Sequence, residues 1–172
     1  PLYSNKNLNY IKDLIYEKFK NDLRDLHLLD KSLSEAQGVL DNFDLCRLLG
    51  SSNSFREVSV SSLLRIPIID KRNQKKQMRV RGRIDLLHVT DSEVLVVDFK
   101  TTRKVPSSVN KIDSLVLSQL ELYNRILCNA YPSQKLVSAI LWTKTANLMR
   151  VPRVSSNEAL NGLFVNQVLD DV

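Results

Sequence analysis

The stretch RGRIDLLHVTDSEVLVVDFKTT, residues 81–102, decides how this chain of 172 residues folds. Its two halves are rich in Val, Ile and Leu, and the polar dipeptide Asp91-Ser92 separates them. Apolar runs on either side of a two-residue polar connection are typical of a β-hairpin. The sequence therefore predicts two antiparallel strands, over residues 78–90 and 93–102.

Counting outward from a two-residue turn places Asp85 opposite Asp98 and Arg83 opposite Lys100. Opposed side chains on one face of a sheet lie about 4.5–5.5 Å apart at Cβ, where like charges destabilise the pairing. A hard divalent cation, which takes oxygen ligands, would cancel the repulsion between the two carboxylates. Lys100 comes two residues after Asp98, so both side chains are expected on one face. The alternative is a solvated face on which Asp85 pairs with Arg83 or Lys100.

Three further residues are candidates for the same site. Glu57 is an acid in an apparent preceding strand, from which it could reach the same edge of the sheet. Gln119 and Tyr123 are four residues apart in a predicted helix and therefore share one of its faces. Their alternative interpretation is an ordinary boundary between the polar and the core face of an amphipathic helix.

The elements around the hairpin complete an α/β pattern. One amphipathic helix is predicted over residues 8–29, and a second begins at Ser34, with a capping box to Gln37, and ends at Gly50. Further strands are predicted over residues 55–68, 135–145 and 147–154, and further helices over residues 113–131 and 157–171. We expect one α/β domain with a mixed central sheet flanked by helices. It comprises a helical lead-in (1–50), a core (55–153) and a C-terminal extension (154–172).

Composition narrows the function classes. Two cysteines, Cys46 and Cys128, exclude a disulfide framework, a four-cysteine zinc site and an iron–sulfur cluster held by this chain alone. No apolar run is long enough to span a membrane, and no glycine-rich phosphate loop is present. The formal net charge of +6 indicates an anionic partner.

The quoted stretch, followed by QLELY at residues 119–123, resembles the PD-(D/E)XK nuclease superfamily. That superfamily has an Asp and, after a short gap, Asp/Glu-x-Lys, which are matched here by Asp85 and by Asp98-Phe99-Lys100. The resemblance implies a restriction-endonuclease-like fold and a deoxyribonuclease that uses Mg²⁺ or Mn²⁺.

The likeness is greater to the RecB-like branch, in particular to the C-terminal nuclease domain of the AddA type of helicase–nuclease. This branch adds an upstream Glu, matched by Glu57, and a Gln-x-x-x-Tyr helix, matched by Gln119 and Tyr123. ILWTKTANLMRVP at residues 140–152 is also similar to the AddA type. The branch usually has a metal-ligating His upstream of the Glu. Because His27 does not stand in that context, we expect this ligand to precede residue 1.

The resemblance also implies a role for each matched residue. The metal ligands would be Asp85, Asp98, Glu57 and the backbone carbonyl of Phe99. Lys100 is expected to orient the attacking water and to stabilise transition-state charge, while Gln119 and Tyr123 position the backbone or the nucleophile. Residues expected to contact nucleic-acid phosphates are Lys75, Lys76, Arg79, Arg81, Arg83, Arg103 and Lys104.

The expected setting is bacterial, cytoplasmic and associated with the nucleoid. Since the chain begins with Pro1 and lacks helicase motifs, we expect a fragment of a longer helicase–nuclease. That enzyme would degrade DNA exonucleolytically during double-strand-break repair, together with the rest of the AddA chain and an AddB-type partner subunit. The alternatives are a stand-alone repair or restriction-type nuclease and a non-catalytic DNA-binding module of the same fold.

Overall fold

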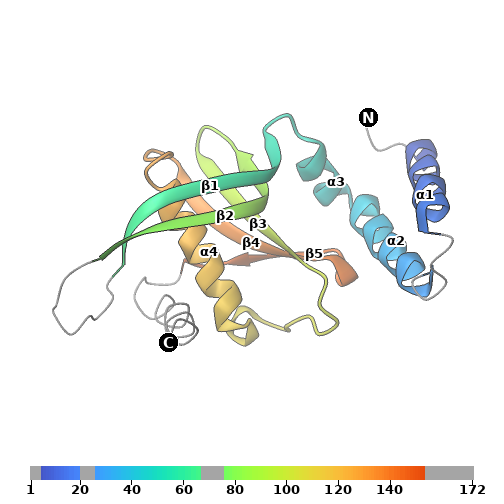
Figure 1. The fold of residues 1–172 in the computed structure, drawn as a ribbon. Helices are drawn as coiled ribbons and strands as arrows, with labels where there is room; N and C mark the ends of the chain where they lie inside the picture. The colour runs from blue at the N-terminus through green and yellow to red at the C-terminus, as the bar shows by residue number, and fades with distance from the viewer. Residues whose placement is uncertain (1–4, 20–25, 67–75, 154–172) are drawn as a thin grey trace.

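The computed structural model describes residues 5–19, 26–66 and 76–153 (Figure 1). The predicted helix over residues 157–171, the rest of the C-terminal extension and Lys75 lie outside these ranges. The described elements are α1 (Asn5–Phe19), α2 (Leu26–Asp41), α3 (Phe43–Gly50), β1 (Ser54–Ile66), β2 (Lys76–Val89), β3 (Glu93–Lys100), α4 (Ser114–Leu127), β4 (Lys135–Trp142) and β5 (Asn147–Val151). None of these helices is both long enough and apolar enough to cross a membrane.

The five strands form one sheet in the order β1-β2-β3-β4-β5. Neighbouring strands are antiparallel except for β3 and β4, which are parallel and are connected through α4. A parallel pair requires a crossover of this kind, because its second strand must begin at the same end of the sheet as the first. The predicted mixed central sheet flanked by helices is confirmed, as is the α/β class.

Helices cover both faces of the sheet, so that β3 and β4 are buried in the middle. α4 packs on one face, where the buried side chains are Ile84, Leu87, Val94, Val96, Leu120, Tyr123, Leu127, Ile140 and Trp142. Val39 of α2 and Leu45 of α3 pack on the opposite face, against Leu86, Leu95, Val97, Ala139 and Leu141. Burial on both faces explains why the sequence of β3 is a nearly continuous apolar run.

The N-terminal helices differ from the prediction. The chain forms α1 and α2 in place of one helix over residues 8–29, and Ser34 lies inside α2 rather than at a helix start. The actual break is at Asn42, whose side chain accepts a hydrogen bond from Leu45 N at 3.2 Å and caps α3. The predicted helix end at Gly50 is confirmed.

The predicted hairpin turn is confirmed, but its register holds only in part. Leu86 pairs with Val97, and the ladder continues in the predicted register up to the turn. It extends no further in the other direction, so Asp85 is not a ladder partner of Asp98, and Arg83 is not a ladder partner of Lys100. That part of the prediction is wrong.

The ladder between β2 and β3 ends early because the alternation of side chains between the two faces breaks at Glu57 in β1 and at Asp85 in β2, a feature called the turnover here. In a regular strand residues 84 and 86 share a face, yet Ile84 packs with α4 whereas Leu86 packs with α2 and α3. Glu57 has a φ of 53°, in the left-handed region that residues other than glycine seldom adopt. The pairing between β1 and β2 skips Glu57 and Asp85.

Beyond this break β1 and β2 pair with each other and no longer with β3. The two strands form an arm, residues 58–66 and 76–84, that extends past the rest of the sheet (Figure 1). β2 is antiparallel to β3, so the arm leaves the sheet at the end where β3 terminates with Lys100. The turnover therefore separates the buried core of the sheet from an arm that begins beside Asp98.

The base of the arm touches α4 through a glycine. A Cβ added to Gly82 would lie 2.6 Å from Cε1 of Tyr123, which is buried, so Gly82→Ala forces an aromatic ring out of place. We expect a loss of about 1–3 kcal/mol in the free energy of unfolding, as for other overpacked sites. The measurement is chemical denaturation.

Gly38→Ala is the matched control, because nothing lies within 4 Å of a Cβ there and the residue is inside α2. It should gain about 0.5–1 kcal/mol from helix propensity. Equal effects at the two positions would contradict the close packing of Gly82 on Tyr123.

Candidate functional site

The site is built around Asp98, near the end of β3. The Asp98 residue is only 5% exposed, an unusual environment for a carboxylate. Lys100 lies two residues further on the same face, and its Nζ is 2.8 Å from Asp98 Oδ2. Alternation along one strand therefore brings the acid and the ammonium together, as predicted from their spacing.

The surroundings of Asp98 disfavour its charged form. Burial is the largest influence and raises the pKa of this carboxyl above its ordinary value. Lys100 acts in the opposite direction, and the charge of Asp85 raises the pKa further. Since the charge of Asp85 acts on Asp98 and Asp85 is bonded to Phe99 N, the structure brings the two predicted carboxylates together although they are not ladder partners.

Asp85 is held by the backbone of the neighbouring strand. Its Oδ2 accepts a hydrogen bond of 2.7 Å from Phe99 N. This bond links β2 to β3 one step past the last ladder pair. Asp85 therefore closes the gap that the turnover of β2 opens, and its carboxylate is fixed next to the Asp98-Phe99-Lys100 segment.

A chain of hydrogen bonds leads from Lys100 to the arm. Lys100 Nζ lies 3.5 Å from Gln119 Oε1, and Gln119 Nε2 donates to Tyr123 Oη at 3.1 Å. The Tyr123 hydroxyl in turn donates to the carbonyl oxygen of Arg83 at 2.8 Å. The predicted shared face of Gln119 and Tyr123 is confirmed. Both side chains contact protein groups here and link Lys100 to β2.

Glu57 interacts with an arginine. Its Oε2 lies 2.7 Å from Arg83 Nε, and both side chains are mostly exposed. Within the described ranges no group of three or more His, Cys, Asp or Glu side chains is arranged to hold a metal ion. The two acids that the structure brings together at this site are Asp85 and Asp98. The role of Glu57 as a metal ligand stays a prediction.

The other predicted nucleic-acid residues lie at the surface where they are described. Arg79, Arg81, Arg103 and Lys104 are exposed. The side chain of Lys76, like the whole of Lys75, is outside the described part of the structure, and so is the side chain of His27.

Sequence reasoning missed one contact near the site. Thr143 Oγ1 lies 3.1 Å from Glu35 Oε2 and 3.4 Å from the carbonyl oxygen of Lys100. This hydroxyl connects α2 to the end of β3 across the fold. No local pattern in the sequence signals a contact between residues so far apart, whereas a glycine inside a strand, such as Gly82, does indicate a close approach.

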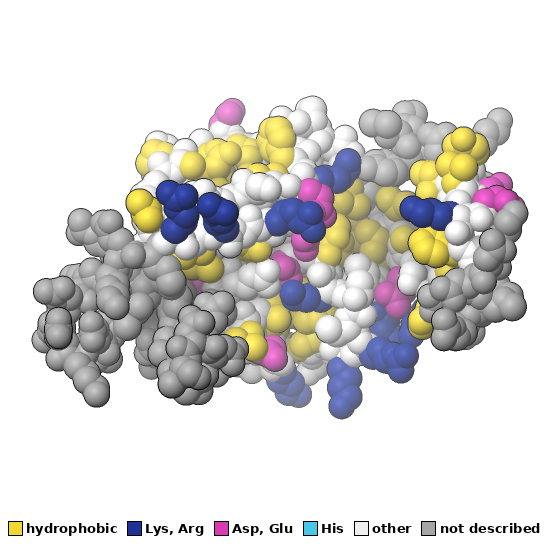
Figure 2. Space-filling view, in the orientation of Figure 1, with side chains coloured by type: hydrophobic (Ala, Val, Ile, Leu, Met, Phe, Trp, Pro, Cys, Tyr) yellow, Lys and Arg dark blue, Asp and Glu magenta, His cyan; other side chains and the backbone are white. Residues whose placement is uncertain are grey.

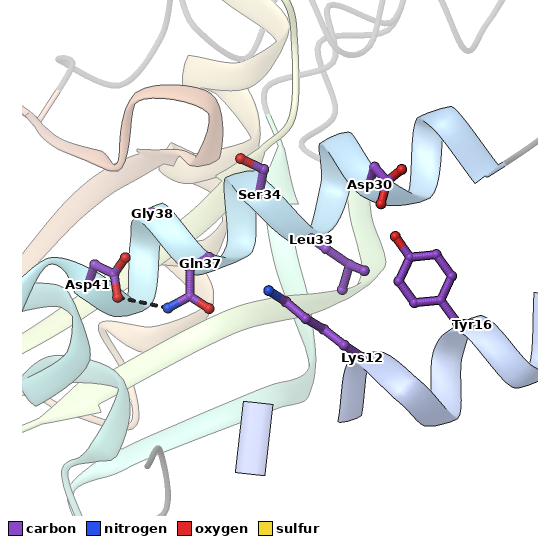
Figure 3. A pocket seen from close by; sticks show the side chains of 8 residues that line it. All are labelled: Lys12, Tyr16, Asp30, Leu33, Ser34, Gln37, Gly38 and Asp41. Carbon is purple, nitrogen blue, oxygen red and sulfur yellow. Dashed lines mark hydrogen bonds between the residues drawn. The ribbon is translucent and has the colours of Figure 1, made fainter. Parts of the chain in front are cut away.

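A separate cleft lies between α1 and α2, with a volume of 430 Å³ (Figure 3). Its lining includes Lys12, Tyr16 and Asp30, and Gln37 Nε2 donates along α2 to Asp41 Oδ1 at 2.7 Å. Its lining contains neither a buried charge nor a residue of the Asp98 site. This cleft is therefore not part of the Asp98 site.

The residues at Asp98 fit a hard divalent cation. Asp98 Oδ2 is buried beside Lys100 and has no hydrogen-bond partner of acceptable geometry in the described structure. Buried carboxylate oxygens normally have such partners, so this oxygen is available to a cation. Mg²⁺ prefers oxygen ligands and commonly uses one or two carboxylates while it keeps several waters. Asp85 and Asp98 match that requirement.

Comparison with known families agrees with this donor set. The family model of the PD-(D/E)XK nuclease superfamily matches residues 10–163. The chain belongs to the PD-(D/E)XK nuclease superfamily. Members of this superfamily are generally nucleases that use a divalent metal, typically Mg²⁺.

The other comparisons add little to this assignment. No curated protein matches the chain. A solved structure titled "Crystal structure of SSO0001" is similar with a TM-score of 0.48 and 14% identity, and the match covers 92% of this chain and 70% of that one. The family assignment therefore rests on the family model.

The raised pKa of Asp98 gives a testable pH dependence. Between the ordinary value of 3.8 and the raised native value, the folded chain binds more protons than the unfolded chain, so stability falls as the pH rises through this window. Asp98→Asn removes the titrating group without removing volume. In a chelating buffer the variant should therefore be more stable than the wild type at neutral pH, by a margin that shrinks as the pH falls.

Denaturant titrations at several pH values below neutrality measure this margin. An advantage that is the same at every pH would show that packing, and not the buried charge, distinguishes the two proteins. A variant less stable than the wild type at neutral pH would show that the ionised carboxylate stabilises the fold.

Proposed function

We propose that this chain is a nuclease domain that hydrolyses the phosphodiester bonds of DNA at Asp98, with Mg²⁺ as cofactor and Mn²⁺ as a substitute. The observation that carries the proposal is the buried Asp98 Oδ2, which lies 2.8 Å from the Lys100 ammonium and has no partner of good hydrogen-bond geometry among the described residues. Asp85 lies beside it and accepts a hydrogen bond from Phe99 N through Oδ2 alone, which leaves its other carboxylate oxygen for a cation.

Asp85 and Asp98 would hold the cation, with the carbonyl of Phe99 and the carboxylate of Glu57 as the further ligands that the family resemblance suggests. When bound, such a cation neutralises charge on the phosphate and lowers the pKa of a bound water. Lys100 is the cationic side chain next to this position. It orients the attacking water and stabilises the negative charge that grows on the phosphate oxygens.

Gln119 and Tyr123 act through Lys100. Gln119 Oε1 faces the ammonium, and Tyr123 holds the amide of Gln119 from the other side. An ammonium on a flexible stem loses much rotamer freedom when it is fixed, and the Gln119 contact limits the positions that it can take. Substitution of Gln119 should therefore lower the rate without removing metal binding.

For the biological setting we propose the exonuclease module of a double-strand-break repair helicase–nuclease. The support is the resemblance of residues 55–153 to the AddA type, which extends to Glu57 and the Gln-x-x-x-Tyr helix. In that setting a motor and an AddB-type subunit deliver DNA to the site and supply a local concentration that the domain alone does not create.

A stand-alone repair or restriction-type nuclease is the second candidate. It is favoured by the exposed Arg79 and Arg81, which give this chain basic side chains of its own on the arm that begins at the site. The two settings differ in the isolated chain. A motor-fed module should cut slowly and lose activity steeply as salt rises, whereas a stand-alone enzyme should cut rapidly at moderate salt.

Cleavage of labelled linear DNA in Mg²⁺ or Mn²⁺ tests the activity itself. Asp98→Asn and Asp85→Asn should each lower the rate at least about 100-fold because they remove a carboxylate ligand, and Lys100→Ala should cost about 10²–10³-fold. Asn at position 85 keeps an acceptor for Phe99 N, so the fold is retained. Gln119→Ala should cost about 10–100-fold, the range for residues that orient others.

The matched control is Glu93→Gln, which removes a half-buried carboxylate paired with Arg150 at the opposite end of β3. It should cut like the wild type. Cleavage by Asp98→Asn at the wild-type rate would refute the proposed site, and the absence of metal-dependent cleavage by the wild type would favour a non-catalytic module.

A further inference from the structure

One face of the arm carries a regular set of polar side chains. Ser59 is directly opposite Arg83 in the β1–β2 pairing, and Ser61 is opposite Arg81. Arg79, two residues before Arg81, continues the row along β2 and is opposite the exposed Leu63. The five polar side chains are exposed, and together they are called the arm face. The other face of the arm holds Val58, Val60, Gly82 and Ile84 and packs toward α4.

The arginines of the arm face have a repeat set by the strand. Positions two residues apart on one face are separated by about 6.4–6.8 Å along the strand, so the three arginine side chains leave β2 at a constant interval. This interval is comparable with the separation of successive phosphates in an extended nucleic-acid strand. Lys and Arg side chains indeed form a row over the arm in Figure 2.

The arginines differ in their partners. Within the described residues neither Arg79 nor Arg81 has an ion-pair partner, so both are available to a ligand. Arg83, at the base of the arm, is paired with Glu57. Arg and Ser are among the residues that most often contact DNA phosphates. Charges that only protect an exposed strand from aggregation would not need hydroxyls opposite them.

The base of the arm face is attached to the candidate site. The carbonyl oxygen of Arg83 accepts the hydrogen bond from Tyr123, which is the end of the chain that begins at Lys100. A strand of DNA that followed the arginines inward would therefore arrive beside Lys100 and Asp98. The arm also leaves the sheet at the end of β3 where these residues lie.

We propose that the arm face binds the sugar–phosphate backbone of the DNA strand that enters the site, one phosphate to each arginine, independently of base sequence. The inference rests on the proposed function only in that the ligand is the substrate of that nuclease. Ser59 and Ser61 donate hydroxyl hydrogen bonds to phosphates already held by the arginines.

Glu57 restrains this surface at its inner end. Its carboxylate lies at 2.7 Å from Arg83 Nε, where the last phosphate of the row would bind. DNA must displace the carboxylate to reach Arg83. Loss of the carboxylate should therefore strengthen binding even in the absence of metal, whereas loss of the other polar side chains of the arm face weakens it.

Fluorescence anisotropy with labelled single-stranded oligonucleotides in a chelating buffer measures this binding without cleavage. The double variant Arg79→Gln/Arg81→Gln should bind about tenfold or more weakly, to mixed-sequence and oligo-dT strands alike. Its slope of log K against log salt should fall by about 1.4, since each phosphate contact on a single strand contributes about 0.7. Thermal denaturation checks that each variant is folded.

The double variant Ser59→Ala/Ser61→Ala should weaken binding and leave the salt slope unchanged, because a neutral hydroxyl releases no counterion. Glu57→Gln should tighten binding and raise the slope by about 0.7 as Arg83 becomes available. Two controls lie at the other end of the sheet. Arg47→Gln/Lys135→Gln removes the same charge from exposed positions, and Glu93→Gln frees Arg150 as Glu57→Gln frees Arg83.

The arm face is refuted if the Arg79/Arg81 variant keeps the wild-type affinity and slope, if its controls lose as much as it does, or if the wild type binds no oligonucleotide. Its failure is distinct from failure of the proposed function. A wild type that binds through the arm but cuts no DNA in Mg²⁺ or Mn²⁺ supports the surface and refutes the nuclease. A wild type that cuts DNA while the Arg79/Arg81 variant binds normally supports the nuclease and refutes the arm face as its DNA-binding surface.

Discussion

A carboxylate held out of water beside one ammonium is the interaction on which the rest of this structure depends. Asp98 is buried, and Lys100 is the cation nearest to it, at 2.8 Å. A buried charge is costly unless it is paired and hydrogen-bonded. Here the pairing is incomplete, because the Lys100 ammonium lies close to Asp98 Oδ2 without the geometry of a hydrogen bond. A cation bound at Asp98 would offset the free-energy cost of burying this carboxylate.

The second constraint is the turnover of β1 and β2 at Glu57 and Asp85. A residue with φ of 53° stores strain that a packed environment must offset. The turnover has two consequences for the site. Where the strands turn over, β2 leaves β3, the Asp85 carboxylate bonds to Phe99 N, and the arginines of the arm face outward while Ile84 packs with α4. One backbone feature thus positions both the second acid and the proposed DNA-binding surface.

The hairpin shows how far sequence reasoning reaches. Asp91-Ser92 and the apolar runs beside it predicted the register correctly up to Leu86, since turn chemistry and side-chain alternation are local. The spacing of Asp98 and Lys100 likewise placed both on one face. The end of the ladder could not be predicted, because no residue type signals that Glu57 adopts a positive φ.

Contacts between distant segments were also beyond the sequence. The helical spacing of Gln119 and Tyr123 predicted that they are neighbours, but the bond from Tyr123 to Arg83 joins residues 40 positions apart. Ser34 has the pattern of a helix start, yet α2 continues through it, and Val39 on the same helix packs on the sheet. Tertiary packing here outweighs a local capping preference.

The most direct test of the claim that Asp98 is held for a cation is the melting temperature of the wild type and of Asp98→Asn with and without Mg²⁺. A cation that binds only the folded protein stabilises it by mass action. The account predicts that Mg²⁺ raises the melting temperature of the wild type and leaves that of Asp98→Asn unchanged. The stability advantage that Asp98→Asn has in a chelating buffer should therefore shrink or reverse. The same shift in both proteins, or no shift in either, would contradict it.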